Sequence, residues 1–170
     1  MACWLLLAGL VPAVAHAQVP SAGLADVTAA FLINFAKFTE WPGDDGVAPM
    51  SLCTNDAGVA KAASEQIVKR PAGSRRLDVQ RVVLDAAPTG CAILYVSGMD
   101  SKRLTLLSTA LKGMSVLTVG DASDFARQGG VIRLFLQGDT MRFEINVSAA
   151  ERAHLRLSSK LLNLAIILRE

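Results

Sequence analysis

The side chains best suited to chemistry are few, and the row around His154 is the first to consider. Glu151 lies three residues before His154 and Ser158 four residues after it, so on a helix the three share one face. Side chains on one helix face do not converge as a nucleophile and its base must. The sequence also has no zinc-ligand spacing, calcium-loop pattern or phosphate-binding glycine motif. We therefore expect no enzyme, no metal and no cofactor.

Basic residues around His154 suggest a binding site instead. Arg152, His154 and Arg156 alternate along the chain, and on a helix His154 points roughly 200° away from Arg152. Arg152 and His154 are the candidate ligand-binding residues, in a site that would need other elements, and the alternative is a solvated basic face. The formal net charge is +2, with no run of four or more basic residues, so nucleic acid is not an expected partner.

The first 17 residues have the features of an export signal. Residues 3–11 are apolar, and Ala15-His16-Ala17 is a small-x-small cleavage site. The apolar stretch is shorter than the roughly 20 residues that a membrane-spanning helix needs. The sequence therefore predicts a signal peptide over residues 1–17 and a periplasmic domain over residues 18–170.

Export changes what the cysteines predict. Beyond residue 17 only Cys53 and Cys91 remain, and an even number of cysteines in an oxidising compartment favours a disulfide. A bond between them would close a loop of about 38 residues, which stabilises by roughly 3–4 kcal/mol in the chain-entropy model. Two buried free thiols are the alternative at this point.

A stripe of apolar residues at helical spacing lies near the start of the predicted domain. Its members are Leu24, Val27, Phe31, Phe35 and Phe38. Their spacing places them on one face of a core helix. Pro42 disfavours helical geometry at the residue before it, so we expect this helix to end at Trp41. The end of the helix, Glu40-Trp41-Pro42, is then a candidate recognition surface.

Further elements follow from periodicity and turn residues. Strands are expected at 50–54, 76–84, 91–96, 115–120, 131–136 and 140–147, and helices at 57–68, 101–112, a short stretch through Phe125, and 148–168. The run 91–96 is apolar throughout, which is typical of a strand buried on both faces in a parallel sheet. The prediction is a single-domain α/β fold. Its mixed sheet is mainly parallel, with an antiparallel edge hairpin, flanking helices, an N-terminal aromatic helix and a long C-terminal helix.

Three blocks of sequence carry a resemblance to a known family. They are AFLINFAKFTEWP at 30–42, the Val-Gly-Asp, Phe125 and Gly-Gly-Val-Ile motif within 119–132, and RFEIN at 142–146 followed by LSSKLL at 157–162. In this order and spacing, residues 25–168 resemble the YfiR family of exported proteins. The family carries a cysteine pair where Cys53 and Cys91 stand, so the resemblance favours the disulfide over free thiols.

The resemblance implies a periplasmic repressor of a membrane-bound diguanylate cyclase. Such a repressor binds the periplasmic sensor domain of the cyclase in the inner membrane, which keeps cyclic di-GMP and biofilm formation low. It also implies a homodimer and an outer-membrane lipoprotein that can sequester the repressor. Because other relatives occur beside sensor kinases, the alternative function is a small-molecule-binding sensor module for a two-component kinase.

A repressor of this kind needs an exposed apolar patch with a polar rim and no catalytic residues. The predicted last helix has more apolar surface than one sheet face can bury. We therefore expect the partner or dimer interface to combine Glu40, Trp41 and Pro42 with Leu161 and Leu162.

Overall fold

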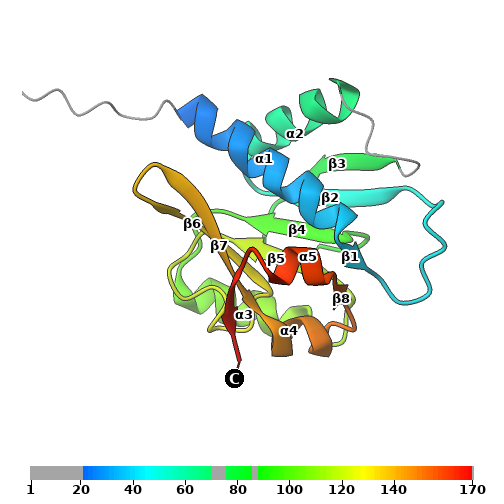
Figure 1. Ribbon diagram of the computed structural model, residues 1–170, viewed down its shortest axis with the longest axis vertical. Helices are drawn as coiled ribbons and strands as arrows, with labels where there is room; N and C mark the ends of the chain where they lie inside the picture. Colours follow the sequence, from blue (N-terminus) through cyan, green and yellow to red (C-terminus); the bar gives the residue numbers. More distant parts are fainter. Residues whose placement is uncertain (1–20, 70–75, 86–87, 170) are drawn as a thin grey trace, which may run out of the picture.

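The computed structural model describes residues 21–69, 76–85 and 88–169 (Figure 1). The predicted signal peptide over residues 1–17 lies outside the described residues. Within the described ranges, no helix is long and apolar enough to cross a bilayer.

A mixed sheet forms the centre of the fold. In spatial order its strands are β3 (Leu77–Arg81), β2 (Met50–Thr54), β4 (Ile93–Val96), β5 (Leu117–Gly120), β6 (Ile132–Gln137), β7 (Thr140–Asn146) and β9 (Ile166–Leu168). The strands from β3 to β6 are parallel, β7 is antiparallel to β6, and β9 runs parallel to β7. The predicted α/β class with a mainly parallel mixed sheet is confirmed. The hairpin β6–β7 is not at the edge as expected, because β9 pairs with β7 and takes that edge.

Helices cover both faces of this sheet. α1 (Ser21–Lys37) and α2 (Ala57–Lys69) lie on one face and α3 (Ser101–Ala110) on the other (Figure 1). In β4, Ile93 and Tyr95 join the core that includes α1, whereas Leu94 and Val96 join the core that includes α3. Because side chains alternate between the two faces of a strand, this strand needs an apolar layer on each side, as its sequence predicts.

Aromatic contacts attach α1 to the sheet. The ring centroid of Phe143 in β7 lies 5.2 Å from that of Phe35 and 5.9 Å from that of Phe31, within the range at which aromatic pairs attract. The helix ends at Lys37, earlier than the expected end at Trp41, because the next residues leave the helix to form a strand.

The N-terminal half of α1 packs differently from the prediction. Leu24 and Val27 are 38% and 42% exposed, so their expected place in the buried stripe is wrong. Ala29 is buried instead and packs with Ala62 and Ala63 of α2. Small side chains let the two helices approach closely, and this contact rotates the stripe away from Leu24 and Val27.

A disulfide joins Cys53 in β2 to Cys91 just before β4, as the family resemblance implies. Both cysteines belong to the core under α3. The sequence separation of the pair is 38, so the bond closes a loop long enough to stabilise by roughly 3–4 kcal/mol.

The position of the Phe125 ring explains why the second sequence block has glycine at positions 120 and 130. Its ring lies between Gly120, at the end of β5, and Gly130, just before β6, and a Cβ on either glycine would overlap the ring. The short helix expected here does not form, since residues 123–129 are a series of turns. Burial of one ring between two glycines holds this segment together with turn hydrogen bonds such as that from the N–H of Gln128 to the carbonyl of Asp124.

The long helix expected over 148–168 does not form either. The segment contains α4 (Val147–Arg152), β8 (Arg156–Leu157), α5 (Ser159–Leu162) and β9. Asn146 rather than Ser148 caps α4, and its side chain accepts a 2.8 Å hydrogen bond from the N–H of Ala149. The helix stops before His154, whose φ of 57° is left-handed.

Two long-range strand pairings override the helical pattern of this segment. β8 pairs with β1 (Thr39–Glu40) and β9 pairs with β7. Leu155 and Leu161 are both 4% exposed and belong to the main core. Helix propensity is a weak preference, and tertiary burial together with ladder hydrogen bonds outweighs it here.

Reduction of the Cys53–Cys91 bond should lower the free energy of unfolding by about 3 kcal/mol, because the unfolded chain regains the freedom of an open loop. The measurement is urea unfolding of the chain from Gln18 with and without reductant. The double variant Cys53→Ala/Cys91→Ala is the control, since reductant should leave its midpoint unchanged. Two thiols titrated in unfolded protein that was never reduced would contradict the disulfide.

Gly130→Ala should lower the free energy of unfolding by about 1–3 kcal/mol, because the new methyl group displaces the Phe125 ring. Thermal and urea unfolding measure the loss. Gly23→Ala is the matched control, since a Cβ there has no atom within 4 Å and alanine favours a helix. The idea fails if Gly130→Ala and Gly23→Ala are equally stable relative to the parent chain.

His154→Val should cost about 1–2 kcal/mol of stability, because branching at Cβ makes the left-handed backbone conformation much less favourable than it is for histidine. His154→Gly should stay within about 1 kcal/mol of the parent, since glycine adopts this conformation freely. Glu151→Val, at an ordinary helical position of α4, is the control for valine itself. Equal losses in His154→Val and Glu151→Val would argue against a left-handed stop.

Candidate functional site

The pairing of β1 with β8 brings the two predicted interface segments together. The strands run antiparallel, with Glu40 opposite Arg156. Beside this pair, the N–H of Ser158 donates a 2.9 Å hydrogen bond to the carbonyl of Phe38. Figure 1 shows β1 next to β8 and α5. The Trp-Pro corner that follows β1 is therefore held near the C-terminal segment.

Trp41 carries the most unusual group of this corner. Its ring is partly buried against the main core. The indole Nε1 and the hydroxyl Oγ1 of Thr39 are both buried without a hydrogen-bond partner among the described residues. A buried donor left unpaired costs about 1–3 kcal/mol, and such groups are uncommon in folded proteins. Both atoms are shielded from solvent, so an acceptor from another molecule would reach them only if the corner repacked.

Apolar side chains of the C-terminal segment extend the surface. Leu162 is partly buried, whereas Leu164 and Ile166 are 73% and 51% exposed. Leu161 is 4% exposed and part of the core, so its side chain is not accessible to a partner. We call the set Glu40, Trp41, Pro42, Leu162 and Leu164 the corner surface. Sequence reasoning missed Leu164 and Ile166, although the apolar character of residues 161–168 on nearly all sides is a signal for them.

A weak ion pair borders the corner surface. Arg156 Nε lies 3.8 Å from Glu40 Oε2, and the two side chains are 86% and 76% exposed. Exposed pairs of this kind contribute little to stability. Both charges therefore remain accessible as part of a polar rim, next to the exposed ring of Pro42.

The structure separates the two candidate ligand-binding residues. Arg152 lines a cavity of about 530 Å³ between α3, the 122–130 segment and α4. His154 is exposed and is not among the residues that line this cavity. A second basic residue, Lys112, also lines the cavity. It follows α3, and the sequence analysis did not single it out. No local pattern connects residues so far apart in the chain.

A second cleft, of about 490 Å³, lies at the carboxyl ends of the parallel strands. Tyr95 and Ser97 at the end of β4, Asp121 after β5, and residues of α1 and α2 line it. In open α/β sheets, ligands commonly bind where the strand order reverses, which is between β2 and β4 here.

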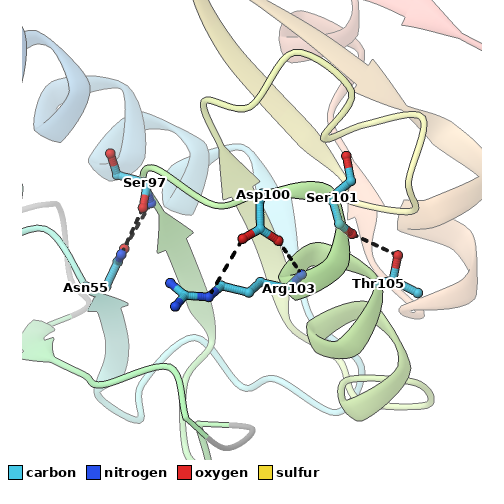
Figure 2. A network of polar contacts seen from close by, with 6 residues as sticks. All are labelled: Asn55, Ser97, Asp100, Ser101, Arg103 and Thr105. Carbon is cyan, nitrogen blue, oxygen red and sulfur yellow. Dashed lines mark hydrogen bonds and ion pairs between the residues drawn. The ribbon is translucent and has the colours of Figure 1, made fainter.

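Internal hydrogen bonds occupy the polar groups of this second cleft that lie at the ends of β4 and β5. Asn55 and Ser97 exchange two 2.9 Å hydrogen bonds across the β2–β4 junction (Figure 2). The carboxylate of Asp121 accepts hydrogen bonds from Ser97 Oγ at 2.7 Å and from the N–H of Gly98 at 3.1 Å. Burial, with a contribution from Asp121, raises the pKa of Tyr95, so its phenol stays protonated. The junction is thus bridged by the chain itself, which disfavours a ligand there.

In the part of the chain that the structure describes, no group of three or more His, Cys, Asp or Glu side chains could hold a metal ion.

Solved structures resemble this chain in fold alone. A conserved domain protein from Vibrio cholerae has a TM-score of 0.54 and 10% identity over 86% of this chain and 60% of its own. The ABC domain from Streptococcus pneumoniae, in complex with L-Trp, has a TM-score of 0.56 and 9% identity over 82% of this chain and 59% of its own. The chain thus spans about 60% of the length of either structure. No curated protein matches.

A family model gives the more specific result. The model described as YfiR/HmsC-like matches residues 25–166, which include most of α1, the disulfide, the Phe125 segment and the corner surface. The chain belongs to the YfiR/HmsC-like family.

Proposed function

We propose that this chain is an exported regulatory protein that represses a membrane diguanylate cyclase. It binds the periplasmic sensor domain of the cyclase in the inner membrane and thereby lowers cyclic di-GMP and biofilm formation. Family membership supports a regulatory role rather than a catalytic one. A signal peptide over residues 1–17, followed by a periplasmic domain over residues 18–170, accords with this role.

The observation that carries the proposal is the corner surface. It combines exposed apolar side chains, a polar rim and a buried indole N–H that has no acceptor among the described residues. A partner that covers the corner would bury Leu164 and the part of the Trp41 ring that is still exposed. Tryptophans in such positions are frequent determinants of binding energy at interfaces.

Repression then follows from a shift in population of the sensor domain. If the corner surface binds the inactive arrangement of the cyclase more tightly than the active one, binding favours the inactive state. Each tenfold difference in affinity between the two arrangements corresponds to about 1.4 kcal/mol. No catalytic group is needed for this step.

Two further partners would use the same surface. A second copy of the chain could pair through it as a homodimer, with each corner facing its counterpart. An outer-membrane lipoprotein that covers the corner would compete with the cyclase and relieve repression. Competition requires only that the binding regions overlap.

The second candidate function is a small-molecule-binding sensor module for a two-component kinase. The cavity of about 530 Å³ beside Arg152 favours it, because this volume is in the range of ligand pockets. The two functions differ in which surface acts, the corner surface or the cavity.

Trp41→Phe and Leu164→Glu should each weaken binding to the cyclase sensor domain about tenfold. The first replaces the ring by a smaller one and so reduces the apolar area that the partner covers, and the second places a charge in the apolar contact. Calorimetry with the purified sensor domain measures affinity, and cyclic di-GMP levels in cells measure repression.

Leu106→Glu is the matched control for the charge, since Leu106 is 63% exposed on α3, away from the corner. This variant should bind and repress as the parent does. Circular dichroism confirms that each variant is folded. Unchanged affinity and unchanged repression in both corner variants would exclude the corner surface as the interface.

A further inference from the structure

The cavity beside Arg152 has walls that are mainly aliphatic. Leu104, Leu107 and Leu111 of α3 line it together with Met114 and Val131. Its volume of about 530 Å³ is in the range that small-molecule sites occupy, and such sites are mostly apolar with a few polar groups that orient the ligand. An apolar body therefore suits the interior.

The charges that line this cavity are all positive. Lys112 and Arg152 are lining residues with exposed side chains, which locates them at the mouth, and no aspartate or glutamate lines the cavity. Neither cation forms an ion pair with a described residue. The second cleft has the opposite character, because Asp26, Asp56, Glu65 and Asp121 line it with Lys61 as the one cation. A negatively charged head group is thus favoured at the first cavity only.

The aromatic ring in the cavity wall offers no stacking surface. Phe125 is 3% exposed, and Gly120 and Gly130 approach its ring closely. A flat aromatic ligand gains most from stacking or edge-to-face contact with a ring, and this ring is enclosed by backbone. The leucine and methionine walls are better suited to a flexible aliphatic chain.

We propose that this cavity binds an aliphatic carboxylate, such as a medium-chain fatty acid. The chain lies against the leucines of α3, and the carboxylate lies between Lys112 and Arg152. Arginine and lysine bind carboxylates through charge-assisted hydrogen bonds. This inference does not depend on which partner the corner surface binds.

Calorimetry of the disulfide-bonded protein with octanoate tests the proposal. Saturable binding at one site is expected, with 1-octanol and octylamine at least fivefold weaker because they lack the negative charge. The double variant Lys112→Gln/Arg152→Gln should weaken octanoate about fivefold and leave 1-octanol unchanged. Arg127→Gln is the matched control. Arg127 is exposed in the 122–130 segment, which borders the cavity, but it does not line the cavity itself.

A second variant tests the location of the aliphatic chain. Ser108 is exposed and lines the cavity, so Ser108→Trp should fill the space and reduce the binding of octanoate and 1-octanol alike. If Ser108→Trp does not fold, the comparison of Lys112→Gln/Arg152→Gln with the parent protein tests the proposal. The proposal is overturned if octanoate does not saturate one site, if octylamine binds as well as octanoate, or if Lys112→Gln/Arg152→Gln binds octanoate as the parent does. 3-Phenylpropionate binding more tightly than octanoate would overturn the aliphatic assignment.

Discussion

The antiparallel pairing of β1 with β8 is the contact on which the arrangement of both ends of the domain depends. It ends α1 before the Trp-Pro corner and stops the C-terminal segment from continuing as a helix. The pairing is short, so its ladder hydrogen bonds alone contribute little. Burial of Leu155 and Leu161 on either side of β8 supplies the larger stabilisation. A surface built from distant segments thereby acquires a defined shape.

Burial of apolar side chains also stabilises the rest of the sheet. Each buried strand needs apolar cover on both faces, which α1 and α2 provide on one side and α3 on the other. The disulfide ties β2 to the start of β4 within the layer under α3. Phe125 fills the end of that layer, and Gly120 and Gly130 leave room for it. The cavity beside Arg152 lies next to this ring, where the cover by α3 ends.

α4 connects the two surfaces of interest. Arg152 and Ala153 at its end line the cavity, and β8 follows after His154 and Leu155. The backbone between them turns through a left-handed residue. The second, acidic cleft lies under α1 and α2 and shares no lining residue with the cavity beside Arg152.

The sequence alone determined the class of the fold, the strand buried on both faces and the cysteine pair, whereas the Trp-Pro corner as a recognition surface stays a prediction. These depend on local periodicity, turn chemistry and motifs, which are visible in a single chain. Only the tertiary structure decided that 148–168 is no helix, that Leu161 is core while Leu164 is exposed, and that Lys112 accompanies Arg152. The spacing of these leucines fits a helix as well as it fits the observed structure. The observed structure is favoured because strands far away in the sequence pair with this segment and the core buries two of its leucines.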